Sequence, residues 1–294
     1  MLRPTILVIG AGGQLGFELA RSLASHGEVI ALDHAALDLG DADAIVATVR
    51  GVRPGLIVNA GAYTAVDRAE SESGAAFAVN ARAPGILAEE ARRQDAVLIH
   101  YSTDYVFDGR RTAPYEEDVP ACPLNVYGAS KYEGERAITA TGARALVFRT
   151  GWVYGARGRN FLLTVLRLAQ ERDELRIVAD QSGTPNWCRT LSAATAATVA
   201  RGLPWLAERS GLYHMASAGA TTWHGFAQAI IGDAPRPRVV PIATSEHPTP
   251  ARRPAYGVLS SHKFETTFAY PMPDWRDGLA ACRSEMRANP LKVD

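Results

Sequence analysis

The sequence lacks several features that mark particular classes of protein. Its 294 residues carry 31 basic and 31 acidic side chains, so the formal net charge is zero, and no basic run is present. This balance gives no support for a nucleic-acid partner or an anionic-membrane surface. No apolar run approaches the roughly 20 residues that a membrane span needs, and the chain does not start like a signal peptide. We therefore expect no membrane contact and a small-molecule partner.

Cysteine is scarce as well. Cys122, Cys188 and Cys282 are odd in number and scattered, without the Cys-x-x-Cys spacing of zinc or redox sites. The pattern predicts no disulfide framework, and we expect the protein to act in a reducing cytoplasm.

The start of the chain has the pattern of a dinucleotide site. An apolar run at 6–9 is typical of a parallel strand covered on both faces, and an amphipathic helix follows it. Between them, Gly10, Gly13 and Gly16 would make the tight turn, let backbone approach a pyrophosphate and allow close helix packing. Asp33 ends the second strand about 20 residues later, where a carboxylate accepts hydroxyls of an adenosine ribose.

The charge beside that ribose leaves the choice of cofactor open. Asp33 would repel the 2′-phosphate of NADP, whereas the adjacent His34 could offset part of the repulsion. Both NADH and NADPH therefore remain candidates from the residues alone.

Four strand–helix repeats with apolar strands predict an α/β fold, a Rossmann-like doubly wound parallel sheet. We expect a dinucleotide-binding domain at 1–155, with a helix at 190–203 packing back on it. Residues 156–294 would mainly form a smaller α/β substrate lobe, with a cleft between the two. Ligands of such sheets lie beyond the carboxyl ends of the strands, where 62–64 and 102–104 fall.

Tyr127 and Lys131 stand four residues apart, so a helix would place them on one face. A free phenol has a pKa near 10, and a neighbouring cation would lower it towards the working range of a proton donor. Thr103 would add a hydroxyl at the same edge of the sheet. The alternatives are a tyrosine and lysine on a solvated helix face, and a threonine that bonds its own backbone.

Three longer motifs make a family resemblance specific. Tyr-Ser-Thr-Asp-Tyr-Val-Phe-Asp-Gly at 101–109, Pro-Leu-Asn-Val-Tyr-Gly-Ala-Ser-Lys at 123–131 and Phe-Arg-Thr-Gly-Trp-Val-Tyr-Gly at 148–155 resemble the dTDP-4-dehydrorhamnose reductases. Segments 59–67 and 211–214 extend the likeness over nearly the whole chain. These extended short-chain reductases carry out the last reduction towards dTDP-L-rhamnose.

The resemblance implies roles for individual residues. Tyr127 would donate a proton to the C4 ketone oxygen, Lys131 would bind the nicotinamide ribose and tune Tyr127, and Thr103 would adjust the hydrogen bonding of the ketone. With the glycine turn included, the predicted cofactor-binding residues are Gly10, Gly13, Gln14, Leu15, Gly16, Asp33, Asp38, Leu39, Ala62, Tyr63, Thr64, Tyr101 and Lys131. The predicted substrate-binding residues are Thr103, Asp104, Tyr127, Trp152 and Arg253. NADPH is the expected cofactor, with NADH as the alternative.

The sequence departs from the family pattern at two positions. Asn186 stands where a threonine usually follows the Asp-Gln-x-Gly-x-Pro turn, so the contacts of that threonine are in doubt. Some members form dimers around magnesium held by glutamates; Glu18 is present here, but Arg189 falls where a second glutamate is expected. A cation disfavours a metal site, so we predict no bound metal and leave the choice between monomer and homodimer open.

The expected activity is NAD(P)H-dependent reduction of dTDP-4-dehydro-L-rhamnose. One rival is reduction of another 4-keto sugar nucleotide, for example to dTDP-6-deoxy-L-talose, because the motifs do not fix which face of the ketone meets the hydride. A second rival is a non-catalytic, nucleotide-binding regulatory subunit. Thr103, Tyr127 and Lys131 argue against it, because a binder needs no proton donor.

Overall fold

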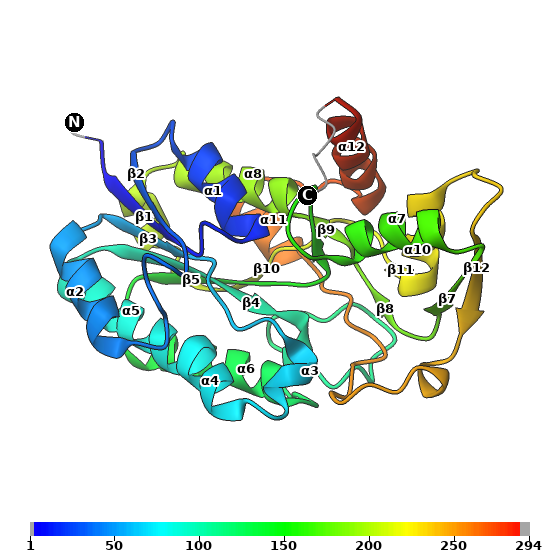
Figure 1. Cartoon of the computed structure of the whole chain (residues 1–294). Helices are drawn as coiled ribbons and strands as arrows, with labels where there is room; N and C mark the ends of the chain where they lie inside the picture. Colours follow the sequence, from blue (N-terminus) through cyan, green and yellow to red (C-terminus); the bar gives the residue numbers. More distant parts are fainter. Residues whose placement is uncertain (1–2, 289–294) are drawn as a thin grey trace.

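The computed structural model describes residues 3–288, which form a large parallel sheet covered on both faces and a smaller lobe at one end of it (Figure 1). In chain order the elements are β1 (Thr5–Ile9), α1 (Gln14–Leu23), β2 (Glu28–Leu32), α2 (Ala42–Val52), β3 (Leu56–Asn59), α3 (Val66–Ala69), α4 (Ser73–Phe77), the π-helical turn η1 (Ala78–Arg82), α5 (Ala83–Arg93), β4 (Val97–Thr103), the 3-10 turn η2 (Asp104–Val106), α6 (Val126–Ala140), β5 (Ala145–Thr150), β6 (Val153–Tyr154), α7 (Phe161–Glu171), β7 (Glu174–Val178), β8 (Ser182–Gly183), β9 (Asn186–Trp187), α8 (Cys188–Val199), α9 (Leu203–Ala207), β10 (Gly211–His214), β11 (Thr221–Thr222), α10 (Trp223–Ile231), β12 (Arg238–Ile242), the 3-10 turn η3 (Thr244–Glu246), α11 (His262–Phe268) and α12 (Trp275–Ala288).

The sheet has six parallel strands in the order β2, β1, β3, β4, β5, β10. The chain winds to one side of β1 with β2 and to the other side from β3 onwards. Ligands of such sheets bind at the carboxyl ends where the winding reverses, which here lies between β1 and β3. The predicted doubly wound α/β fold is confirmed.

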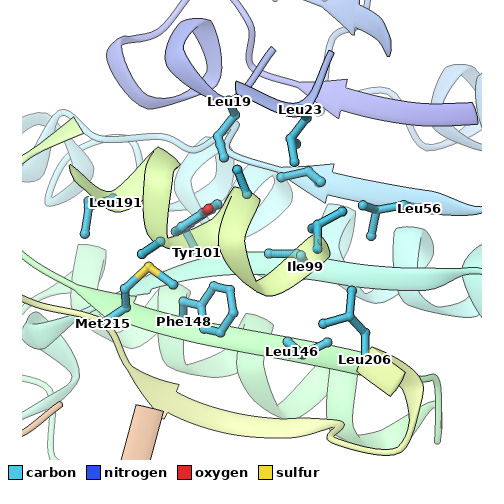
Figure 2. Packing of buried hydrophobic residues seen from close by; sticks show 14 of the residues in the cluster. Leu19, Leu23, Leu56, Ile99, Tyr101, Leu146, Phe148, Leu191, Leu206 and Met215 are labelled. Carbon is cyan, nitrogen blue, oxygen red and sulfur yellow. The ribbon is translucent and has the colours of Figure 1, made fainter. Parts of the chain in front are cut away.

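Apolar strands in this sheet are covered on both faces. One face packs against α1, α8 and α11, and Figure 2 shows Leu19 and Leu23 of α1 facing Ile99 and Phe148 of the sheet. The helices α2, α5 and α6 cover the other face through a second buried cluster. Continuous apolar strands such as β3, all of whose residues are buried, are the expected result.

The helix predicted at 190–203 corresponds to α8, which spans Cys188–Val199, and a separate short helix, α9, begins at Leu203. Gly202, with φ of 91°, precedes α9, and α8 contributes Leu191 and Ala194 to the cluster beneath α1. The strand β10 pairs with β5, and α11 also covers the sheet, so several elements beyond residue 155 pack with the large sheet. The division at 155 stays a prediction, and residues 289–294 of the proposed substrate lobe lie outside the described part.

The smaller lobe has a core of its own. Strands β7 and β12 pair in parallel, and α7, α10 and α12 pack around them. Tyr154, Phe226 and Trp275 are buried in this core. The two-residue pairs β6–β9 and β8–β11 complete the lobe. Between residues 3 and 288, no helix is long and apolar enough to cross a membrane.

Candidate active site

The glycine turn after β1 requires glycine at specific places. Gly10 has φ of 83°, and a Cβ there would lie 2.6 Å from the amide nitrogen of Gly61 beyond β3. A Cβ on Gly16 would lie 2.1 Å from the Gly10 carbonyl oxygen, so α1 starts directly against the turn. No side chain caps α1 at Gly13. The free amides of this helix start and the bare backbone around it suit the pyrophosphate of a dinucleotide.

The residues predicted to hold adenosine lie next to this turn. Asp33 is exposed, and one carboxylate oxygen accepts a hydrogen bond from the Ala36 amide at 3.0 Å. Asp38 likewise accepts from the Gly40 amide at 2.8 Å, and the His34 ring lies 3.8 Å from it. Each carboxylate is thus oriented by a local turn and keeps lone pairs for ribose hydroxyls.

Several predicted cofactor residues face protein. Gln14 accepts from the Asn160 amide at 2.7 Å, Leu15 packs against the sheet core, and Leu39 is buried against Gly61. The Tyr63 hydroxyl donates to Glu72. Any cofactor contact by these four would come from backbone or from part of the side chain.

Asn80, which the sequence analysis missed, fixes the turn at 62–64. Its amide accepts from the Tyr63 amide nitrogen at 2.8 Å and donates to the Tyr63 carbonyl and the Ser130 hydroxyl, both at 3.0 Å. Asn80 lies in the π-helical turn η1, and a Cβ on Gly134 would lie 2.1 Å from its carbonyl oxygen. Such π-helical turns often occur at functional sites. The sequence signal that could have found Asn80 is an asparagine within an alanine-rich helix.

The first turn of α6 presents Tyr127. Asn125 caps the helix by accepting from the Gly128 amide at 2.8 Å, and it donates to the Arg252 carbonyl at 2.8 Å. A Cβ on Gly128 would lie 2.2 Å from the Tyr105 carbonyl oxygen, so α6 packs directly on the turn after β4. The half-buried Tyr127 ring meets that of Tyr105 edge-on, with centroids 5.7 Å apart.

Tyr127, Thr103 and Lys131 all meet the end of β4. The Thr103 hydroxyl accepts from the Tyr105 amide at 3.1 Å, and the Tyr105 ring packs on that of Tyr127. The Lys131 Nζ is buried, donates to the Tyr101 carbonyl at 2.6 Å and lies 3.2 Å from the His100 Nε2. The structure therefore brings the three predicted catalytic residues to one strand end.

The predicted effect of Lys131 on the Tyr127 pKa is wrong. Burial raises the pKa of Tyr127 to about 12; the charge of Asp104 also raises it, and the nearby Thr103 side chain lowers it. Burial lowers the pKa of Lys131 to about 8, although Glu135 opposes this shift. An ammonium already bound to a backbone carbonyl does not offset the cost of burying a phenolate. Tyr127 is therefore held protonated at neutral pH.

The sequence analysis also missed His100, whose ring lies between Lys131 and Asn59, next to the glycine turn. Its Nδ1 lies 3.1 Å from the Asn59 amide nitrogen, and the Asn59 oxygen accepts from the Gly61 amide at 3.1 Å. Burial and the charge of Lys131 hold the His100 pKa well below its usual value, so the ring is neutral. A histidine inside an apolar strand was the only available signal.

Trp152 and Arg253 lie on the lobe side. Trp152 has φ of 47° and stacks on Trp223 with ring centroids 3.5 Å apart. Arg253 forms an ion pair with Asp67 at 2.9 Å. These two predicted substrate residues therefore already have protein partners.

A cavity of about 260 Å³ opens beside them, and its lining includes Trp223, Arg176 and Arg253. Asn125, which caps the helix that carries Tyr127, donates to the carbonyl of Arg252, the residue before Arg253. The cavity therefore lies near the first turn of α6.

The two departures from the family pattern have defined contacts. The buried Asn186 donates to the Gly151 carbonyl at 2.7 Å and accepts from the Ser217 amide at 2.6 Å, so it orders the segment before Trp152. Arg189 bridges Glu18 at 3.1 Å and Glu285 at 2.6 Å. Within residues 3–288, no group of three His, Cys, Asp or Glu side chains could hold a metal ion.

A parallel doubly wound sheet, a glycine turn at its switch point and a tyrosine, lysine and threonine at the next strand end define a dinucleotide-dependent reductase of the short-chain type. The RmlD substrate binding domain family matches residues 4–288. The chain belongs to this family, that of the dTDP-4-dehydrorhamnose reductases.

Individual proteins similar to this chain carry the name of the same family. The chain is 51% identical over 289 residues to the dTDP-4-dehydrorhamnose reductase of Burkholderia thailandensis, covering 94% of this chain and 97% of that protein. It is 42% identical over 293 residues to the Escherichia coli K12 enzyme of that name, with 96% and 97% covered. The Bacillus anthracis dTDP-4-dehydrorhamnose reductase, solved in complex with NADP, superposes with a TM-score of 0.89 at 33% identity, covering 97% of this chain and 100% of that one.

Proposed function

We propose that this protein reduces the C4 ketone of dTDP-4-dehydro-L-rhamnose to give dTDP-L-rhamnose, with NADPH as reductant and NADH as an alternative. The observation that carries the proposal is the meeting of Tyr127, Thr103 and Lys131 at the end of β4, in a chain half identical to a reductase of this name. The proposal includes action in the cytoplasm, as a monomer or a homodimer.

The residues at the strand end fit this chemistry. Bound nicotinamide supplies a hydride to the ketone carbon, and the protein must supply a proton to the oxygen. Tyr127 is the proton donor, since its pKa of about 12 keeps it protonated. An ammonium has three donor protons and one of them is directed at the Tyr101 carbonyl, so Lys131 can also donate to a ribose hydroxyl.

The cavity suits the rest of a sugar nucleotide. Trp223 offers an aromatic face in its lining, and Arg176 and Arg253 bring positive charge to the same space. Planar bases stack on aromatic rings, and guanidinium groups bind phosphate oxygens in pairs. We therefore assign the nucleotide part of the substrate to this cavity and the keto sugar to the side of Trp152 and Asp104.

The test is a product assay. The protein is incubated with dTDP-4-dehydro-L-rhamnose and NADPH, and the product is identified by NMR. Formation of dTDP-L-rhamnose supports the proposal, and exclusive formation of the talo product would overturn the substrate assignment. Tight NADPH binding without reduction of any 4-keto sugar nucleotide would instead identify a regulatory subunit.

A further inference from the structure

Three buried polar side chains form a row from the end of β3 to α6. Asn59 of β3 and His100 of β4 are neighbours across the sheet, and Lys131 reaches them from α6. The Asn59 amide nitrogen lies 3.1 Å from the His100 Nδ1, and the His100 Nε2 lies 3.2 Å from the Lys131 Nζ. Both ring nitrogens are therefore engaged, and the one that carries the proton decides what Lys131 can do.

The main chain fixes the orientation of the Asn59 amide. A backbone N–H can only donate, and that of Gly61 donates to the Asn59 Oδ1 at 3.1 Å. A flipped amide would turn its NH2 group towards the Gly61 N–H, so that two donors would face each other. Gly61 itself is packed against Gly10 of the glycine turn. The Asn59 nitrogen therefore faces His100.

This orientation fixes the tautomer of His100. The Asn59 nitrogen donates, so the His100 Nδ1 must accept, and the single proton of a neutral imidazole then lies on Nε2, towards the Lys131 Nζ. An ammonium has no lone pair with which to accept it. Lys131 can accept only as an uncharged amine, which still has a proton for the Tyr101 carbonyl at 2.6 Å.

We propose that His100, held in one tautomer by Asn59, is a positioning residue that donates to Lys131 and favours its uncharged amine form. The inference rests on the proposed function only for the place of the nicotinamide ribose at Lys131. Oxidised nicotinamide carries a positive charge that the reduced ring lacks, so an ammonium there disfavours NAD(P)⁺ and an amine does not. His100 thereby affects how strongly the site prefers the reduced cofactor.

The other groups around Lys131 act in both directions. Burial also favours the amine and lowers the pKa of Lys131 to about 8, whereas the charge of Glu135, one turn further along α6, opposes this shift. Both Glu135 oxygens are bound by Arg149 of β5. Tyr127, one turn earlier, stays protonated and adds no charge at neutral pH. Lys131 should therefore lose its charge near pH 8, well below the value of about 10 for a free lysine.

The first test uses the protein without cofactor or substrate. The chain has three lysines, so NMR of protein labelled with ¹³C at lysine Cε gives few signals, and Lys131→Met identifies that of Lys131. We expect this signal to titrate near pH 8, and about one pH unit higher in His100→Gln, whose amide oxygen can accept from an ammonium. An unchanged titration in His100→Gln would overturn the proposal.

Lys263 is the internal control for this titration. It also donates to a backbone carbonyl, that of Leu212 at 2.8 Å, but its side chain is exposed. Its signal should titrate alike in the wild type and in His100→Gln. An equal shift of both lysines would show a general effect of the substitution and contradict a specific role of His100.

A second measurement needs only the wild-type protein. The ¹⁵N shifts of labelled histidine, with His100 assigned by comparison with His100→Gln or His100→Phe, should show a proton on Nε2 and none on Nδ1. A proton on Nδ1 would overturn the proposal, because Nε2 would then accept from an ammonium.

The consequence for the cofactor is measured by binding alone. From about pH 7 to about pH 9, the affinity for NADP⁺ relative to NADPH should rise about tenfold in fluorescence titrations, and this rise should move to higher pH in His100→Gln. A ratio that does not change with pH would contradict the link between Lys131 and nicotinamide. None of these measurements uses a sugar nucleotide, so they can fail while the reductase assay succeeds and hold while it fails.

Discussion

The two sides of the candidate site are built in opposite ways. At the end of β4, titratable side chains are buried, carry shifted pKa values and are joined by short hydrogen bonds, as Lys131 and Asp104 illustrate. On the lobe side, stacked indole rings and half-exposed arginines surround an open cavity. Buried polar networks suit proton transfer, whereas aromatic and cationic surfaces suit binding. The first side should therefore control kcat and the second KM.

The largest effect is expected at Tyr127. Tyr127→Phe removes the proton donor but keeps the ring that packs on Tyr105, so kcat should fall about 1,000-fold. NADPH affinity, measured by fluorescence titration, should change less than about twofold, because the hydroxyl acts in the transition state. An equal loss in turnover and cofactor affinity would contradict the assigned role.

The second prediction concerns a buried ion pair between β5 and α6, the two elements that pack beside β4. Arg149 makes a two-pronged pair with Glu135 at 2.6 and 2.9 Å, and both side chains are buried. Arg149→Met leaves an unpaired buried carboxylate, so the free energy of unfolding should fall by about 3–5 kcal/mol in urea titrations.

A matched control lies in the smaller lobe. Arg236 and Asp173 form an ion pair at 2.7 Å in which both side chains are exposed. Arg236→Met should leave the urea midpoint nearly unchanged, because exposed pairs contribute little. Equal destabilisation by the two variants would show that the two sides do not differ as described.

The third prediction tests the binding side. Trp223→Ala removes the partner of Trp152 and one wall of the cavity. KM for the sugar nucleotide should rise about tenfold while kcat stays within about twofold. Steady-state kinetics with the dTDP sugar measures both values, and a drop confined to kcat would count against the division into two sides.

The smallest effect is expected at the adenosine end. Asp33→Asn keeps the acceptor for the Ala36 amide but removes one exposed negative charge. The ratio of kcat/KM for NADPH to that for NADH should rise about fivefold, in line with one screened charge contact. An unchanged ratio would mean that Asp33 does not face the 2′ position.

The sequence predicted the parts of the site that depend on local pattern. The glycine turn follows from three residues at fixed spacing, and the shared face of Tyr127 and Lys131 follows from helix geometry. The pKa of Tyr127 could not be predicted in this way, because its shift comes from burial by segments far apart in the chain. Asn80 and His100 were missed for the same reason, since their partners lie 17 to 50 and 31 to 41 residues away.

The bond between Arg253 and Asp67 has a consequence for how an anion is received. It joins the segment after β12 to the helix α3, and Asp67 also accepts from the Ala251 amide at 3.2 Å. On the proposed assignment, an incoming diphosphate at Arg253 would compete with a carboxylate that is already in position. Its net gain would be the difference between the two contacts, which would favour a doubly charged anion over a weakly charged one.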